Sequence, residues 1–276
     1  MTHPQIAAFA REAKENEPPV RTIEGQKTLI SRTMHGFSYD PIHDEIVVNS
    51  PLTQAILTFR GSANGEEAPI RVIQGPKTRI LGMGYAALST VTADPEHNEI
   101  FLPVGSGGYR SAGTGGPEGV LVFDRTANGD VAPKRILSGP DTQIRSATPQ
   151  VAVDPIHNLL VVKSGGALLI FDREASGNTK PLRVIKGPKT GGFGGGQIAV
   201  YAEKGWILTN ARDDWAVWSV FDDGDVAPRW KIPVKELTGG GRQNAGIAII
   251  PKFKEIMIAC SQTNKVVTFY FPELFE

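Results

Sequence analysis

Four arginines occur where the chain passes from one repeated segment to the next. Each follows a threonine by one to four residues, and they are Arg32, Arg79, Arg145 and Arg242. A guanidinium group can donate two parallel hydrogen bonds, which matches a carboxylate, a phosphate or a sulfate. If the four side chains converge, we therefore expect an anion site. Because their offsets from the threonine differ, the alternative is that each arginine pairs with a neighbouring segment or lies in solvent.

The histidines fall into two groups. His43, His97 and His157 occupy the same place in three Asp-Pro-x-His segments. Equivalent positions of a repeat lie in separate structural units, so we expect a role in a turn rather than joint binding of a metal ion. His35 lies outside the repeat, close in sequence to Arg32. We expect it at the same candidate site, with a packed or solvated histidine as the alternative.

Aromatic and polar residues extend this candidate site. The glycine-rich insertion 105–119 contains Tyr109, and the segment 210–218, which we expect to project as a loop, contains Arg212 and Trp215. Aromatic rings beside cationic groups are typical of recognition sites. The full set of expected ligand-binding residues is Arg32, His35, Arg79, Tyr85, Tyr109, Arg145, Phe193, Arg212, Trp215, Arg242 and Asn244.

Sequence signals for catalysis are weak. The chain contains no Gly-x-Ser-x-Gly and no His-Glu-x-x-His motif. Its single cysteine, Cys260, excludes an intramolecular disulfide and a cysteine-based metal cluster. Asp213 and Asp214 are adjacent, so in an extended loop their side chains point apart. We expect no catalytic residue, no bound metal and no cofactor.

An internal repeat determines where these residues lie. A phenylalanine ends a short apolar run at Phe9, Phe59, Phe123, Phe171, Phe221 and Phe269. Most intervals also contain a Pro-x-Arg segment, a turn similar to Gly-Pro-Lys-Thr, and Asp-Pro-x-His before a β-branched run. Such runs, bounded by Gly, Pro, Asn and Asp, are typical of strands. Four strands in a unit of about 45 residues indicate the blade of a β-propeller.

The strand count predicts an all-β propeller of four-stranded blades, with five blades favoured and six as the alternative. First, second and fourth strands each occur five times, whereas the third-strand pattern occurs six times. We expect the N-terminal fourth strand, 20–24, to pair with the three C-terminal strands, because proteins avoid open sheet edges. On this interpretation residues 1–276 form one domain, in which 1–17 is a helical or loose extension.

Composition excludes two classes of partner. Lysine plus arginine and aspartate plus glutamate both number 29, so the formal charge is zero. A general nucleic-acid binder would carry a basic excess. The sequence has no run of 18 apolar residues, so we expect no membrane span. It also shows no basic region followed by an apolar stretch at its start, and we expect no signal peptide within it.

Segments such as VAVDPIHNLLVV, LLIFDR and PLRVIKGP resemble the NHL and YncE-like propeller repeats of bacterial surface-layer and lactonase-like proteins. The resemblance covers nearly the whole chain and implies the propeller fold. It does not select an activity, because such propellers include lactonases, lyases, sensor domains and scaffolds. Propellers of this type are frequently exported, which favours a secreted or periplasmic location with the leader absent from this sequence.

The resemblance also allows a comparison with lactonase-like propellers, which hold a metal through Glu, Asp and Asn side chains of their inner strands. In the segments that precede the first strands of this chain, only Asn244 is a comparable ligand. We therefore expect a monomeric, non-enzymatic scaffold that binds a small anionic molecule or another protein. The alternative is a hydrolase or lyase of the lactonase-like type that uses His35 together with the arginines, and a purely structural surface-layer role comes third.

Overall fold

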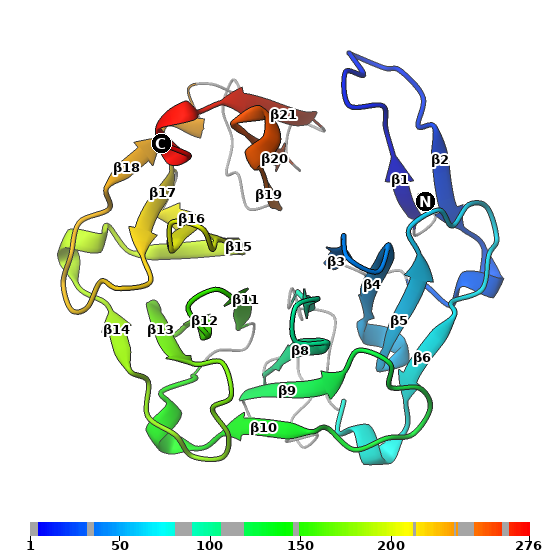
Figure 1. Cartoon of the computed structure of the whole chain (residues 1–276), viewed down its shortest axis with the longest axis horizontal. Coiled ribbons are helices and arrows are strands. Elements are labelled where there is room, and N and C mark those ends of the chain that lie inside the picture. Colours follow the sequence, from blue (N-terminus) through cyan, green and yellow to red (C-terminus); the bar gives the residue numbers. More distant parts are fainter. Residues whose placement is uncertain are drawn as a thin grey trace. The chain divides into compact units, whose positions relative to one another are not determined.

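The computed structural model describes residues 5–31, 36–80, 90–105, 119–145, 149–211, 214–234, 236, 246–260 and 265–276. The chain is all-β and has the fold class that the repeat predicts, a five-bladed β-propeller built from antiparallel sheets (Figure 1). It divides into two compact units, residues 1–136 and 137–276. No helix in the described part of the chain is both long and apolar enough to cross a membrane.

Unit 1 contains two four-stranded sheets and a hairpin. The first sheet has the order β3(Phe37–Asp40), β4(Glu45–Ser50), β5(Ala55–Arg60) and β6(Arg71–Gln74). The second has the order β7(Thr92–Asp94), β8(Glu99–Val104), β9(Gly119–Asp124) and β10(Arg135–Ser138), the last of which runs across the unit boundary. The hairpin consists of β1(Gln5–Ala8) and β2(Arg21–Glu24).

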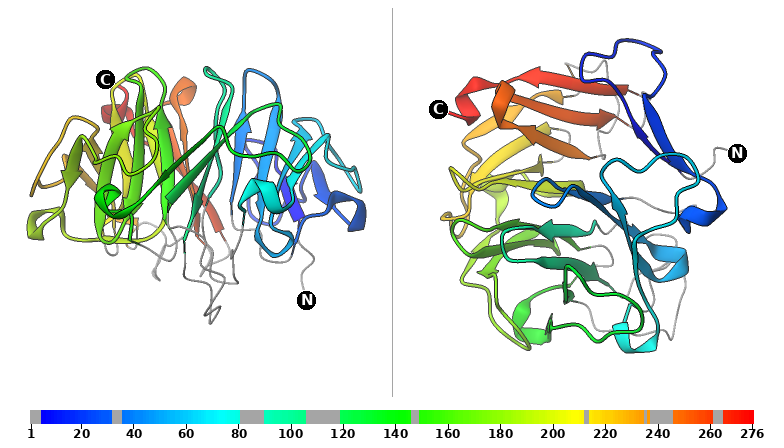
Figure 2. Two further views of the ribbon diagram at one scale, coloured as in Figure 1. Left: turned by 90° about the horizontal axis from the view of Figure 1, so that it is seen from below. Right: turned by 45° about the vertical axis from the view of Figure 1, so that its right-hand side comes forward.

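Unit 2 contains two four-stranded sheets and one three-stranded sheet (Figure 2). The first sheet has the order β11(Gln150–Asp154), β12(Leu159–Ser164), β13(Ala167–Asp172) and β14(Arg183–Ile185). The second has the order β15(Phe193–Tyr201), β16(Trp206–Ala211), β17(Asp214–Ser219) and β18(Trp230–Ile232). The third is formed by β19(Ile247–Ile250), β20(Glu255–Cys260) and β21(Lys265–Tyr270). The first strands of the sheets are β3, β7, β11, β15 and β19, and their number is the one that the sequence predicts.

The third strand of each four-stranded sheet contributes many of the core residues. Phe59, Phe123 and Phe171 are fully buried at equivalent places, and each such side chain contributes about 1.5–3 kcal/mol on burial. In β17 this place is taken by Trp218, whose neighbour Val217 lies opposite Trp230 as Thr58 lies opposite Arg71. Phe221, which the sequence repeat suggested for this place, lies beyond the strand and is exposed. An indole can replace a phenyl ring there because both are large apolar groups.

The pairing of β2 corrects two expectations. Residues 21–24 pair with β1, from Gln5 opposite Glu24 to Ala8 opposite Arg21, and not with the C-terminal strands. The segment 5–8 is thus a strand rather than a helical or loose extension. Its local hairpin costs less loop-closure entropy than a pairing between the two ends of the chain. Ile6 and Ile23 stabilise the hairpin by packing into the core of the β3–β6 sheet.

A repeated set of contacts, which we call the clasp, ties four of the fourth strands to the loop between the third and fourth strands of the following blade. These strands are β2, β6, β10 and β14. In unit 1, Gly129 N–H donates to Val72 O at 2.7 Å, and Gln74 N–H donates to Gly129 O at 3.2 Å. Asp130 Oδ1 accepts the Lys77 N–H at 2.7 Å. In unit 2, the residues Val184, Lys186, Gly224, Asp225 and Lys189 make the corresponding contacts at 2.8–3.0 Å.

A linking stretch is the segment that joins a fourth strand to the next first strand, and the clasp holds the start of the four linking stretches that follow β2, β6, β10 and β14. A short 3-10 helix follows the glycine, as in η3(Pro76–Thr78) and η4(Pro140–Thr142), and its threonine hydroxyl donates back to the glycine carbonyl at 2.6–2.7 Å. Arg79 follows directly after η3, and Arg145 is the third residue after η4. The backbone before these two arginines is therefore held by contacts on both sides of the glycine.

Candidate functional site

The structure describes four of the eleven candidate residues, namely Arg79, Arg145, Phe193 and Trp215. The other seven lie outside the described residues: Arg32, His35, Tyr85, Tyr109, Arg212, Arg242 and Asn244.

Arg79 ends η3 and lies beside a small pocket. It adopts a left-handed backbone conformation with φ 57°, and its side chain is exposed. The next residue, Ile80, lines a pocket of about 240 Å³. The other lining residues are Thr53, Gln54, Gln74, Gly75 and Pro76.

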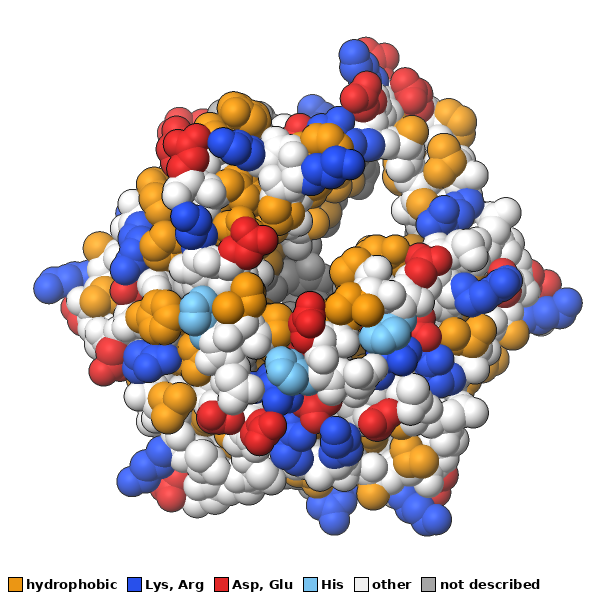
Figure 3. Space-filling model, viewed as in Figure 1, with side chains coloured by type: hydrophobic (Ala, Val, Ile, Leu, Met, Phe, Trp, Pro, Cys, Tyr) orange, Lys and Arg blue, Asp and Glu red, His pale blue; other side chains and the backbone are white. Residues whose placement is uncertain are grey.

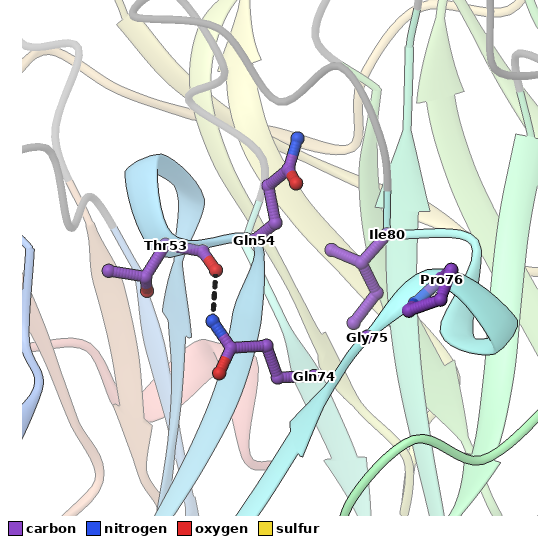
Figure 4. Close-up of a pocket in the computed structure, with 6 residues that line it drawn as sticks. All are labelled: Thr53, Gln54, Gln74, Gly75, Pro76 and Ile80. Carbon is purple, nitrogen blue, oxygen red and sulfur yellow. Dashed lines mark hydrogen bonds between the residues drawn. The ribbon is translucent and has the colours of Figure 1, made fainter.

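Figure 4 shows that this pocket is bordered by polar groups from two chain segments. Gln74 Nε2 donates to the Thr53 carbonyl at 2.7 Å, which links β6 to η2(Pro51–Thr53) across one side. Gln54 has a left-handed backbone with φ 53° and an exposed side chain. Ile80, which is buried, supplies an apolar wall. The pocket thus offers amide groups and an apolar surface next to the position of Arg79.

Arg145 lies in the corresponding stretch that follows η4. Its side chain is exposed, and its backbone N–H donates to Ser164 Oγ at 2.9 Å. The Ser31 N–H, which precedes Arg32, donates in the same way to Ser50 Oγ at 3.0 Å. Arg79 and Arg145 therefore lie at different distances in sequence from the 3-10 helix that precedes them. In both cases the preceding backbone is held by hydrogen bonds.

The described arginines divide sharply by their side-chain partners. Those in or near the blade strands all have one: Arg135 donates to both carboxylate oxygens of Glu99 at 2.6 and 2.7 Å, and Arg71 donates to Glu45. The same is true of Arg11, Arg21, Arg60, Arg125, Arg173, Arg183 and Arg229. Among the arginines that the structure describes, only Arg79 and Arg145 have a guanidinium group with no hydrogen bond or ion pair.

The ion pairs of the blade strands are strong enough to shift a pKa. Burial raises the pKa of Glu99, but hydrogen bonds from Arg135 and Lys134 and their positive charges outweigh it and lower the pKa to about 2. Lys134 Nζ lies 2.9 Å from Glu99 Oε1. Arginines with such partners are already compensated, so they are not available to a ligand.

Phe193 and Trp215 belong to the core rather than to a surface site. The ring centroids of Phe193 and Trp218 lie 5.0 Å apart. Trp215 of β17 is 1% exposed and lies opposite Ile232 of β18. The expectation that 210–218 projects as a loop is wrong for Trp215, because β16 and β17 extend into this segment and Asn210 lies opposite Trp215. The alternation of the segment is that of a strand, which turns Trp215 inward.

The three repeat histidines have the turn role that their spacing predicts. Asp40 Oδ1 accepts the His43 N–H at 3.0 Å, and Asp40 Oδ2 lies 2.8 Å from His43 Nδ1. The pairs Asp94–His97 and Asp154–His157 repeat this arrangement. Each aspartate is buried and compensated within its own turn. Among the described His, Cys, Asp and Glu residues, no group of three or more could hold a metal ion.

Sequence reasoning missed one buried ionisable residue, Lys163 of β12. Its Nζ donates to the Gly196 carbonyl at 2.6 Å, to Thr209 Oγ1 at 2.9 Å and to Asn210 Oδ1 at 3.4 Å. Burial lowers the pKa of its amine to about 7. The three acceptors satisfy the three N–H donors of an ammonium group, so the residue links the β11–β14 sheet to the β15–β18 sheet.

A signal for Lys163 is present in the sequence. The fifth residue of the second strand is polar in three blades, in EIVVNS, LLVVKS and WILTNA, although most residues of these strands are apolar. A polar residue at a repeated position of a buried strand indicates a hydrogen-bonded network. That network places Lys163 and Asn210 in contact.

No protein-family model matches the chain, and no curated protein matches it either. The interpretation of function therefore depends on the geometry described above.

Proposed function

We propose that this protein is a non-enzymatic binding scaffold whose linking stretches take an anionic ligand, either a small molecule or an acidic group of another protein. One observation carries the proposal: Arg79 and Arg145 have free guanidinium groups, whereas every other described arginine has a partner. A guanidinium group held on a rigid backbone and left without a protein acceptor is suited to bind a carboxylate or a phosphate from outside.

Two properties of the surroundings support this proposal. The clasp and the 3-10 helices hold the backbone before each arginine, so binding orders mainly a side chain, which reduces the entropic cost. The protein has no net charge, so an anion is not attracted to the molecule as a whole and its binding depends on local positive charge. Basic and acidic side chains are interspersed on the face shown in Figure 3, in keeping with this balance.

The experiment compares melting temperatures in citrate and in chloride at equal ionic strength. A ligand that binds only the folded state stabilises it by RT ln(1 + [L]/Kd), about 2.7 kcal/mol at a hundredfold excess over Kd. We expect citrate to raise the melting temperature beyond the chloride value. In the double variant Arg79→Ala plus Arg145→Ala, this citrate-specific rise should shrink by at least half.

The matched control removes the same charge from exposed residues outside the linking stretches, Lys180 and Lys231. The variant Lys180→Ala plus Lys231→Ala should keep the full citrate-specific rise. An equal rise in all three proteins would show that the arginines are ordinary surface charges and that citrate acts through the solvent. The hydrolase or lyase alternative depends on His35, which lies outside the described residues, and no described contact favours it.

A further inference from the structure

In the part of the chain that the structure describes, the last sheet of unit 2 lacks a fourth strand, so its third strand, β21, forms an edge of the sheet. In the four complete sheets the third strand lies between a second and a fourth strand, whereas β21 has a neighbour only in β20 in the described structure. Val266 and Tyr270 of β21 are 60% and 71% exposed. The residues that correspond to Val266 in β5, β9 and β13 are buried, whereas the last residue of each of these strands, which corresponds to Tyr270, is not. An uncovered apolar edge strand is a template for another strand.

Two strands have the sequence pattern of a third strand that could pair with β2, namely β1 and β21. In complete blades the residue before the core phenylalanine lies opposite the arginine of Pro-x-Arg, as Thr58 lies opposite Arg71. β1 places Ala8 opposite Arg21 in the same way, with Phe9 following. β21 has the same pattern, with Thr268 followed by Phe269. The chain thus has one more third strand than it has fourth strands.

β2 is held in unit 1 without help from β1. Glu24 N–H donates to Gly65 O at 3.1 Å, and Gly65 N–H donates to Thr22 O at 2.6 Å. Asn64 Oδ1 also accepts the Thr22 N–H at 3.2 Å. These clasp contacts come from the loop after β5, so they persist if β1 leaves. β1 is therefore the exchangeable partner of β2.

We infer that β21 of a second copy of this chain replaces β1 on β2, and that the exchange is reciprocal within a dimer. The register of the complete blades places Arg21 opposite Thr268, Thr22 opposite Val267, Ile23 opposite Val266 and Glu24 opposite Lys265. A two-fold dimer of this kind contains the same strand pair twice and leaves neither β21 edge open. Neither β2 nor β21 contains Arg79 or Arg145, the arginines of the proposed anion site.

Charge and side-chain shape favour β21 over β1 as the partner of β2. Glu24 lies opposite the neutral Gln5 in the hairpin but would lie opposite Lys265 in the exchanged sheet, and Lys265 makes no ion pair within the described residues. Thr22 lies opposite Ala7 in the hairpin but would lie opposite Val267. Opposite charges and β-branched residues stabilise cross-strand pairs, whereas alanine is a poor strand residue. These gains accrue twice in the dimer.

The first test uses engineered cysteines at facing positions. Residues opposite each other in an antiparallel pair have Cα atoms about 4.5–5.5 Å apart, within the range of a disulfide. Under mild oxidation, the pair Thr22→Cys plus Val267→Cys should give a covalent dimer whose yield rises with protein concentration. The matched pair Ala7→Cys plus Thr22→Cys, which faces across the hairpin, should link within one chain and keep the protein monomeric by locking β1 onto β2.

Disulfide formation of the first pair within a single chain at every concentration would overturn the exchange, since it would place β2 on the same molecule's β21. No link at all, with the hairpin pair fully oxidised, would overturn it as well. Single-cysteine variants control for random collision, and the native Cys260 is buried.

A charge swap tests the same surface without cysteines. Lys265→Glu places two carboxylates opposite each other and should raise the dimer dissociation constant about tenfold, because each dimer contains the pair twice. Glu24→Lys should do the same, and the double variant should restore the original value. Both side chains lie at the surface or near it, so the monomer stays folded. Additive effects without rescue in sedimentation experiments would contradict the register.

Discussion

At the scale of the residue, burial and partners separate side chains that look alike in the sequence. Arg79 and Arg135 are both arginines of the repeat, yet one is exposed without a partner and the other binds both oxygens of Glu99. The residue type alone predicts a cation at either place. Only the position of Glu99, on β8 next to the strand that pairs with β10, decides which of the two is compensated.

Lys163 gives a pH-dependent prediction at this scale. Its pKa is about 7 in the folded protein against 10.5 for an unperturbed lysine. Between these values the unfolded chain binds more protons than the folded one, so this group makes the free energy of unfolding rise with pH by about 1 kcal/mol per pH unit. We expect urea denaturation of the native protein at pH 7, 8 and 9 to show this rise, and Lys163→Met to reduce it.

The comparison stops at pH 9 because burial, together with the hydrogen bond to Glu203, raises the pKa of Tyr201 to about 12, which adds the opposite slope above pH 10. Lys186→Met, at an exposed lysine, is the control and should keep the native slope. A native slope in Lys163→Met would mean that Lys163 remains charged throughout this range.

At the scale of the element, the clasp explains the repeated glycine of Gly-Pro-Lys-Thr. Gly75 has φ 132°, a region that side chains with a Cβ rarely adopt, and an added Cβ would lie 2.5 Å from Asp130 Cγ. We expect Gly75→Ala to lower the free energy of unfolding by about 2–3 kcal/mol, from backbone strain together with loss of the clasp. The measurement is chemical denaturation.

Gly129→Ala is the matched control, because Gly129 also has a positive φ, 79°, but an added Cβ would meet nothing within 4 Å. Its cost should be limited to about 1–2 kcal/mol of backbone strain. Equal losses in the two variants would show that the approach of Asp130 to Gly75 contributes nothing.

The same scale shows what the sequence could predict. Strands such as QVAVD and LLIFDR were predictable because alternation and β-branched residues make their periodicity local. The β1–β2 hairpin was not, because β1 and β21 carry the same pattern and only competition for β2 decides the pairing. Trp215 was misplaced because DDWAVW was taken for a loop, and Lys163 was missed because its acceptors come from another sheet.

At the scale of the whole molecule, balanced charge and open strand edges act together. Lysine plus arginine equals aspartate plus glutamate, and the pI is about 7.0, so charge repulsion between copies is weakest near neutral pH. Near neutral pH, long-range charge repulsion therefore does not keep a second copy of the chain away from the exposed residues of β21. We therefore expect solubility to be lowest near pH 7 and to rise toward pH 5 and pH 9, as measured by light scattering at fixed protein concentration and low salt.

A charge variant distinguishes this effect from the strand exchange. Lys180→Glu plus Lys231→Glu changes the net charge by about −4, since each substitution removes one positive charge and adds one negative charge. Both residues are exposed and lie outside β2 and β21. The solubility minimum should move to lower pH, whereas the yield of the dimer linked between positions 22 and 267 should persist at 150 mM salt, where the Debye length is about 8 Å and long-range repulsion is screened. A minimum that stays at pH 7 in this variant would show that the net charge does not determine where solubility is lowest.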